Sequence, residues 1–333
     1  MNKKRWFLWG AALAGAYSIW HRPLDRLPAD SKSLERYSDE TLLNLSTYSD
    51  YREVLIHSTG TKIALSLYES GKQAPCIIFL PGTMVHPLFY DEFLTALAKN
   101  GFNVVGVHLV SHGKSPRERK LYSFQDMVQN TADAISYCIQ RFNDNVILMG
   151  SSQGGILSLA CACQDKRIKA VFPHNVLLPS LPDSIRVTRF PEFLKPFHKI
   201  IPHLMNLGAK IIPDYQIPGT FYLDLTRVFT VQSTQERFFS DPLALTSYPL
   251  FFLASLFSAD LSGVTDGSLH CPVVVIASTG DPLFPYDYCL EVYEQIVTTQ
   301  KEMLVLNEPH HLIFNECIET VVDPIVNKLK SYT

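Results

Sequence analysis

Residues 146–155 read VILMGSSQGG, and this stretch decides the fold. The apolar run at its start predicts a buried strand, and residues 153–163 predict a helix, so a tight turn must join them. Residues 150–154 fit the pattern G-x-S-x-G, which in this context is typical of a nucleophile elbow. Glycines suit a sharp turn between close backbones, and Ser152 would have a strained conformation that exposes its hydroxyl. The alternative is a structural turn in which serine only caps the helix.

Continuous apolar runs of the same kind recur along the chain, as expected of strands that are buried on both faces. Helical patterns separate most of them, and this alternation predicts parallel crossovers. The expected strands are 76–80, 104–107, 146–149, 170–172, 273–277 and 303–306, and the expected helices are 90–100, 124–142, 153–163, 286–298 and 313–330. Two alternating segments, 53–57 and 62–68, predict an edge hairpin. The fold class is therefore α/β, with a doubly wound, mostly parallel sheet.

The alternation of strands and helices stops between residues 179 and 264. No buried strand is expected there, and the segment is rich in Pro, Phe, Leu and Ile. Because the strand pattern then resumes, this insertion predicts a helical cap over the carboxyl edge of the sheet. The expected domains are an N-terminal apolar segment at 1–22, a linker at 23–51, a core at 52–178 and 265–333, and the cap at 179–264.

A serine hydroxyl is a weak nucleophile, so a histidine base and an orienting carboxylate should follow Ser152 in the order acid, histidine. Asp281 follows the run 273–277, at a strand end where site residues of open α/β sheets collect. An ordinary Asp-Pro turn is the alternative reading. His310 and His311 follow the last apolar run, and either one is a candidate base.

The oxyanion of a tetrahedral intermediate needs two backbone N–H donors. One is expected from Gln153, which follows the serine at a helix N-terminus. The other is expected from Thr83, in the loop Pro81-Gly82-Thr83-Met84 that follows the run 76–80. An ordinary strand-to-helix turn is the alternative for this loop.

From about residue 53 onward, the chain resembles the α/β-hydrolase superfamily, and most closely its monoacylglycerol lipase and lysophospholipase (S33-like) branch of serine hydrolases. Residues 81–86, PGTMVH, are similar to the HGxGEH oxyanion loop of that branch, and residues 111–115, SHGKS, to its GHGxS turn. Residues 150–155 are similar to its GHSMGG elbow. The resemblance implies that Asp281 is the acid and His311 the base, with His310 as second choice.

Several positions depart from the motifs of this branch. Among them are Pro81 and Met84 in the oxyanion loop and Ser151 and Gln153 in the elbow, where relatives carry His, Gly, His and Met. None of these changes removes a member of the Ser–Asp–His triad. They do touch the pocket, and so they bear on the substrate.

The sequence thus predicts a serine hydrolase that cleaves carboxylic esters through an acyl-enzyme. A lipid-like substrate, a monoacylglycerol or lysophospholipid, is expected because the cap is rich in apolar side chains that are candidates for an acyl-chain site or for the cap's own core. The candidates for the pocket are Phe190, Phe193, Phe197 and Leu204. An amidase, peptidase or thioesterase with the same triad is one alternative, and a catalytically silent binding protein of the same fold is another.

Composition excludes several other classes of function. The 333 residues carry 29 Lys and Arg against 32 Asp and Glu, so the basic excess expected of a nucleic-acid-binding protein is missing. The seven cysteines include no CxxC pair and predict neither a zinc site nor a disulfide framework. No metal and no cofactor is expected.

The N-terminus has the form of a signal or anchor segment. Lys3, Lys4 and Arg5 precede an uncharged run, 6–20, which is shorter than the ~20 residues that span a bilayer. We expect membrane association through this segment, with the catalytic domain on the non-cytoplasmic side; cleavage followed by export, or a cytoplasmic location, is the alternative. Seven unpaired cysteines conflict with an oxidising destination.

Overall fold

The computed structural model describes residue 46 and residues 48–333. The predicted segment 1–22 and most of the predicted linker 23–51 therefore lie outside the described residues. Within the described part of the chain, no helix is both long enough and apolar enough to cross a membrane.

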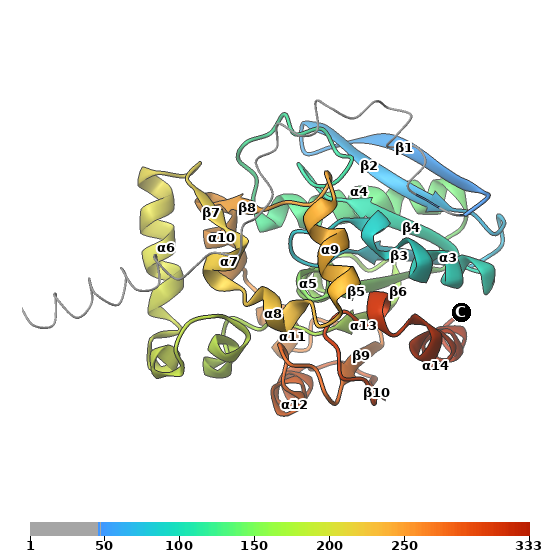
Figure 1. Ribbon diagram of the computed structural model, residues 1–333. Coiled ribbons are helices and arrows are strands. Elements are labelled where there is room, and N and C mark those ends of the chain that lie inside the picture. Colours follow the sequence, from blue (N-terminus) through green and yellow to red (C-terminus); the bar gives the residue numbers. More distant parts are fainter. Residues whose placement is uncertain (1–45, 47) are drawn as a thin grey trace, which may run out of the picture.

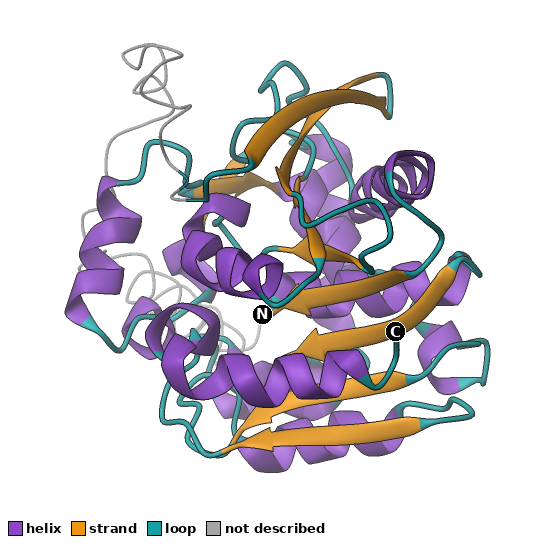
Figure 2. Cartoon of the chain, turned by 90° about the vertical axis from the view of Figure 1, so that its right-hand side faces the viewer, coloured by secondary structure: helices purple, strands orange, loops and turns teal. Residues whose placement is uncertain are grey.

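An eight-stranded sheet forms the centre of the molecule, in the order β1-β2-β4-β3-β5-β6-β9-β10 (Figures 1 and 2). The strands are β1 (Tyr51–Ser58), β2 (Thr61–Tyr68), β3 (Cys76–Leu80), β4 (Asn103–His108), β5 (Val146–Ser151), β6 (Ile168–His174), β9 (Val273–Ser278) and β10 (Lys301–Leu306). The pairs β1–β2 and β2–β4 are antiparallel, and every neighbouring pair from β4 to β10 is parallel. The predicted α/β fold with a mostly parallel sheet is confirmed.

Each predicted apolar run lies within a strand of this sheet. In β3, β4, β5 and β9 every residue is buried, as continuous apolar runs require when helices cover both faces of a sheet. The predicted hairpin is formed by β1 and β2. Its turn residues, Thr59 and Gly60, have φ of +50° and +78°, which suits a two-residue turn between twisted strands.

Helices pack on the two faces of the sheet (Figure 2). They are η2 (Pro87–Tyr90), α3 (Asp91–Lys99), α4 (Phe124–Arg141), α5 (Gln153–Gln164), α12 (Tyr286–Gln295), α13 (Ile313–Glu316) and α14 (Ile318–Lys330). The prediction of a single helix over 313–330 is wrong in one detail, because two helices, α13 and α14, cover this range. They are separated at Cys317, whose φ of −134° is outside the helical range.

The chain between β6 and β9 is mostly helical, and we call this segment the cap; α6, α7 and α10 lie at one side of the sheet (Figure 1). Its helices are η3 (Pro182–Val187), η4 (Glu192–Phe197), α6 (Ile200–Ile211), α7 (Gly219–Tyr222), α8 (Leu225–Val228), α9 (Gln232–Ser240), α10 (Leu250–Phe257) and α11 (Ser262–Thr265). The cap also contains two short antiparallel strands, β7 (Gln216–Pro218) and β8 (Ser247–Pro249). The expectation of no buried strand here was wrong, because Tyr248 in β8 is fully buried. Strands of three residues have no detectable apolar run.

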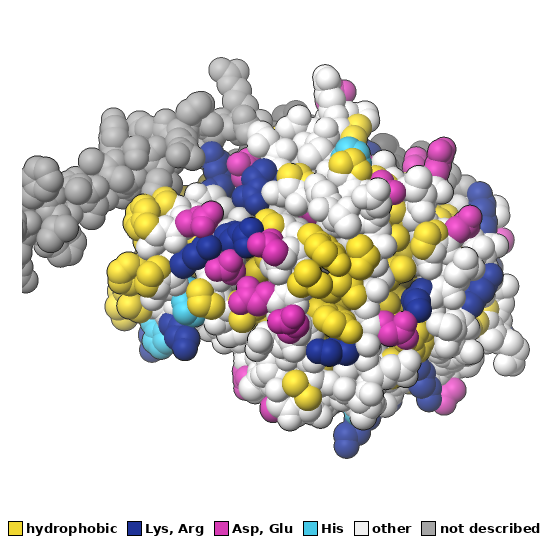
Figure 3. Space-filling view, turned by 90° about the horizontal axis from the view of Figure 1, so that it is seen from below, with side chains coloured by type: hydrophobic (Ala, Val, Ile, Leu, Met, Phe, Trp, Pro, Cys, Tyr) yellow, Lys and Arg dark blue, Asp and Glu magenta, His cyan; other side chains and the backbone are white. Residues whose placement is uncertain are grey.

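The outer face of α6 is apolar. Ile200, Leu204, Leu207 and Ile211 recur at helical spacing, and each is at least half exposed. Figure 3 shows hydrophobic side chains gathered at the side of the molecule where α6 lies.

Candidate active site

Ser152 lies at the tip of a sharp turn between β5 and α5. Its φ of +53° and ψ of −113° are strained for a residue with a side chain. The Ser152 N–H donates to the His174 carbonyl at 2.8 Å, which ties the turn to the end of β6. A strained serine held in this way is the geometry expected of a nucleophile elbow.

The glycines around Ser152 are sterically required. A Cβ built on Gly150 would lie 1.9 Å from the Gly154 carbonyl oxygen, and one built on Gly154 would lie 2.0 Å from the Leu80 oxygen. A Cβ on Gly155 would lie 2.7 Å from the His174 oxygen. Since all these neighbours are backbone atoms, no side-chain movement relieves the contacts.

Asp281 and His311 form a buried pair. The His311 Nδ1 lies 2.9 Å from the Asp281 Oδ2, and both residues are at most 5% exposed. The second carboxylate oxygen of Asp281 accepts the N–H groups of Leu283 and Phe284 at 2.7 and 2.8 Å. With Nδ1 donating to Asp281, the other ring nitrogen of His311 is left as the acceptor.

The pKa of Asp281 is lowered although the carboxyl is buried. Burial is the largest influence and by itself would raise the pKa, but the charge and hydrogen bond of His311 and the Phe284 N–H together outweigh it. Asp281 is therefore ionised at neutral pH, as an acid that orients an imidazole must be.

Asn175 is a site residue that the sequence analysis missed. Its side-chain Nδ2 donates to the Asp281 Oδ2 at 2.6 Å, and its φ is +57°, a conformation that asparagine tolerates better than most residues. Its position in the sequence could have indicated this role, because it is a polar residue directly after an apolar strand.

His310, the second-choice base, has different neighbours. Its Nδ1 lies 2.6 Å from the Thr230 Oγ1 and 3.4 Å from a Glu316 carboxylate oxygen. It lines neither of the two cavities described below, whereas His311 lines one of them.

A small cavity of about 20 Å³ lies between the elbow and the cap, and Ser152, Thr83 and His311 all line it. Within the described structure, the N–H groups of Thr83 and Gln153 donate to no protein acceptor. Gln153 is the first residue of α5, where N–H groups have no partner inside the helix and the helix dipole favours negative charge. The cavity thus brings together a hydroxyl, an imidazole and a free N–H.

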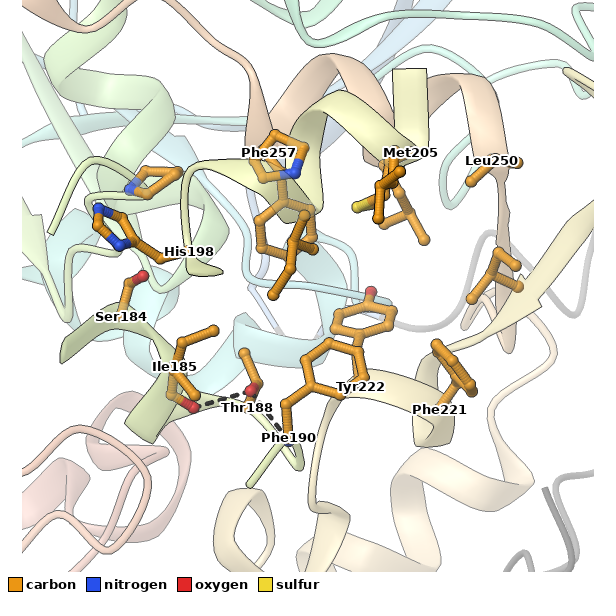
Figure 4. Close-up of a pocket in the computed structure, with 16 residues that line it drawn as sticks. Ser184, Ile185, Thr188, Phe190, His198, Met205, Phe221, Tyr222, Leu250 and Phe257 are labelled. Carbon is orange, nitrogen blue, oxygen red and sulfur yellow. Dashed lines mark hydrogen bonds between the residues drawn. The ribbon is translucent and has the colours of Figure 1, made fainter. Parts of the chain in front are cut away.

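A larger apolar cavity of about 240 Å³ lies within the cap (Figure 4). In Figure 4 the side chains of Ile185, Phe190, Tyr222 and Phe257 gather around it. Of the predicted pocket residues, Phe190 and Leu204 line this cavity.

Phe193 and Phe197, in contrast, line neither cavity and are 72% and 49% exposed. The prediction that these two residues line the substrate pocket is therefore corrected. Both lie on η4, a short 3-10 helix with no buried residue. Their apolar character alone did not show which way they face.

The described residues include no group of three His, Cys, Asp or Glu side chains that could hold a metal ion. All seven cysteines are free thiols. Burial raises the pKa of Cys161 and Cys289 to about 12, so these thiols stay protonated at neutral pH.

Residues 71–318 match the family described as "Serine aminopeptidase, S33". The match covers well over half of the chain, so the chain belongs to this family of α/β-hydrolases. The predicted resemblance to this branch is confirmed, and a hydrolase is the class that the family indicates.

Solved structures with a similar fold include two lipases. The monoacylglycerol lipase of Paleococcus ferrophilus is 20% identical, with a TM-score of 0.66 over 81% of this chain and 99% of that chain. A soluble variant of the monoglyceride lipase of Saccharomyces cerevisiae, in complex with a substrate analogue, is 16% identical, with a TM-score of 0.67 over 86% and 97%. At these identities the likeness establishes the fold.

A curated relative, named "Putative non-heme haloperoxidase", comes from Mycobacterium phage D29. It is 29% identical over 133 residues, and the match covers 40% of this chain and 43% of that relative. The chain therefore spans less than half the length of this relative.

Proposed function

We propose that this protein is a serine hydrolase that cleaves carboxylic esters of lipid-like substrates through an acyl-enzyme. The observation that carries the proposal is a single cavity lined by Ser152, Thr83 and His311, with His311 hydrogen-bonded to the buried Asp281.

The proposed reaction has two steps. The Ser152 Oγ attacks the ester carbonyl carbon while the free ring nitrogen of His311 takes the hydroxyl proton, and the N–H groups of Thr83 and Gln153 stabilise the oxyanion. His311 then returns the proton to the leaving alcohol, and the acyl group stays on Ser152. In the second step water attacks the acyl-enzyme while His311 takes one of its protons. His311 then returns this proton to the Ser152 Oγ as the bond between that oxygen and the acyl carbon breaks, which releases the carboxylic acid.

The apolar cavity supports an acyl chain as the group bound by the cap. Tyr222 lines the larger cavity and Leu223, the next residue, lines the small one, so the same short segment of the cap contributes to both cavities. Each methylene buried in such a pocket contributes about 0.8 kcal/mol. We expect kcat/KM to rise from acetyl to octanoyl esters, by at most about fourfold per methylene. A decline over this series would contradict the acyl-chain site.

One observation favours an ester over the substrate of an aminopeptidase. An aminopeptidase must bind a free amino group, and a buried ammonium needs a nearby carboxylate. Among the residues that line the two cavities there is no Asp and no Glu. Ester, thioester and aminoacyl-amide substrates assayed side by side test this point, and preferred cleavage of the aminoacyl amide would contradict it.

The nucleophile is tested with a fluorophosphonate probe. The wild type should be labelled and Ser152→Ala should not. Ser151→Ala is the matched control, because it removes a buried hydroxyl one residue away while leaving the proposed nucleophile. Equal labelling of Ser152→Ala and wild type would overturn the assignment.

We also propose that the enzyme works at a lipid surface. The exposed apolar face of α6 supports this, since Leu204 belongs to that face and also lines the apolar cavity. Leu207→Glu and Ile211→Glu should lower binding of the full chain to phosphatidylcholine vesicles, while hydrolysis of a dispersed short-chain ester stays unchanged. Undiminished vesicle binding would exclude α6 as the contact.

A further inference from the structure

The oxyanion loop contains an unexpected strained residue. Met84 has φ of +66°, in the left-handed region where a side chain costs of order 1 kcal/mol. Such a conformation persists only where its surroundings hold it.

The cap holds Met84 from both sides of its backbone. The Met84 N–H donates to the Tyr248 hydroxyl at 2.8 Å, and its carbonyl accepts the Leu245 N–H at 2.8 Å. Next to this, the His86 Nε2 lies 2.7 Å from an Asp241 carboxylate oxygen, which also belongs to the cap. The cap therefore holds the part of this core loop from Met84 to His86.

The Tyr248 hydroxyl has a second partner on the core. It lies 3.2 Å from the His112 Nε2, and the His112 Nδ1 lies 2.7 Å from the Val110 carbonyl oxygen. A carbonyl can only accept, so Nδ1 carries the proton and Nε2 accepts from the phenol. Burial, the largest influence, lowers the pKa of His112 to about 4, which keeps the ring neutral at pH 7.

A second tyrosine acts on the other side of the loop. The Gly82 N–H donates to the Tyr90 hydroxyl at 3.3 Å. Of the three consecutive N–H groups at 82, 83 and 84, the outer two are thus bound by tyrosine hydroxyls. The middle one, from Thr83, has no acceptor in the described structure and lines the catalytic cavity.

We propose that Tyr248, oriented by His112, is a positioning residue that works with Tyr90 to keep the Thr83 N–H free and directed at the developing oxyanion. This inference rests on the proposed function, because it concerns the donor used in that reaction. An oxyanion donor acts best when it is fixed before the charge develops, so a hydroxyl that holds the neighbouring peptide contributes to catalysis without touching the substrate.

Tyr248→Phe tests the proposal by removing a single oxygen atom. We expect kcat for a short-chain ester to fall by about tenfold to a hundredfold with little change in KM, because only the charge of the transition state is affected. His112→Leu should lower kcat less, since the hydroxyl can still accept the Met84 N–H. The kcat of the double variant should equal that of Tyr248→Phe alone, because His112 acts on the loop only through its hydrogen bond to the Tyr248 hydroxyl.

Tyr288→Phe is the matched control. The Tyr288 hydroxyl is also buried and also accepts a backbone N–H, from Leu178 at 3.0 Å, away from the oxyanion loop. Tyr288→Phe should lose about as much unfolding free energy as Tyr248→Phe but keep the kcat of the wild type. Equal kcat losses in Tyr248→Phe and Tyr288→Phe would reduce Tyr248 to a structural role and overturn the proposal.

Hydrogen exchange separates this proposal from the proposed function. The Met84 N–H should exchange slowly in the wild type and at least tenfold faster in Tyr248→Phe, whether or not any ester is hydrolysed. Unchanged exchange in Tyr248→Phe would overturn the positioning role even in an active enzyme. Failure of Ser152 to react would instead overturn the proposed function.

Discussion

The nucleophile elbow and the oxyanion loop each contribute one N–H to the proposed oxyanion site, but they are held differently. The elbow is fixed by the core, since its glycines pack against the backbone oxygens of β3 and β6. The loop is held at Met84 by the cap, through Tyr248 and Leu245, and at Gly82 by Tyr90 of the core. Steric exclusion among backbone atoms makes the elbow rigid, whereas the loop depends on hydrogen bonds.

Gly154→Ala should have the largest effect on the elbow. The added Cβ would meet the Leu80 oxygen at 2.0 Å, and we expect a loss of more than about 3 kcal/mol in unfolding free energy, with activity abolished. Urea denaturation measures the loss. The control, Gly208→Ala, also lies within a helix, but its Cβ meets only a Leu250 side-chain atom at 3.2 Å, so it should be neutral or stabilising. Equal stability of the two variants would show that the elbow is not sterically fixed.

Acid should weaken both regions, because each contains a buried neutral histidine. Burial, the largest influence, lowers the pKa of His112 beside the loop to about 4 and that of His174 beside the elbow to about 3. Between pH 6.5 and these values the unfolded chain binds protons that the folded protein does not. The contribution of each histidine to the unfolding free energy is therefore fully present above pH 6.5. It falls as the pH drops below 6.5, by up to about 1.4 kcal/mol per pH unit for each group.

Urea denaturation between pH 7 and pH 4.5 measures this slope. His174→Gln should reduce it, and His203→Gln, at an exposed position, should leave it unchanged. A slope that is the same in all three proteins would show that His174 is not buried in its neutral form.

Gly219→Ala tests the cap side of the oxyanion loop. Its Cβ would lie 2.0 Å from the Met84 Sδ, so we expect a loss of about 1 to 3 kcal/mol in stability together with lower kcat. Met84→Ala in the same chain removes the obstructing sulfur and should restore much of both. Additive effects in this double-mutant cycle would show that the cap does not press on the loop at Met84.

Asn175→Gly tests the acid side of the site with the smallest expected effect. Glycine tolerates the φ of +57°, so the variant removes the side-chain amide without backbone strain. This amide donates to Asp281 and also lies 3.2 Å from the His311 Nδ1. Loss of a hydrogen bond to a charged group corresponds to about a tenfold fall in kcat/KM. Wild-type kcat/KM in this variant would exclude a role for Asn175 in holding the carboxylate.

The strands and the glycines of the elbow could be predicted because their causes are local. A run such as CIIFL at 76–80 indicates burial on both faces, and a turn without room for side chains requires glycine. The rule that site residues collect at the strand ends located Asp281 and the pair His310 and His311, and the family resemblance then selected His311. Their roles, and that of Thr83, stay predictions until they are tested.

The parts that could not be predicted depend on contacts between distant segments. Nothing near Met84 indicates that Tyr248 binds its N–H, and Asn175 meets Asp281 only once β6 and β9 are paired. The outward orientation of Phe193 and Phe197 likewise depends on how η4 is placed. The composition predicted that the cap is apolar, but it did not show which of its apolar side chains face the cavity.

The contact between Met84 and Tyr248 spans 164 residues of chain. A contact this distant in sequence closes a long loop, and its entropic cost is recovered only when both segments are already folded. During synthesis from the N-terminus, β3 and the elbow are complete well before the cap emerges. The catalytic site should thus form late, so a chain still attached to the ribosome would already have the serine turn but could not yet catalyse the reaction.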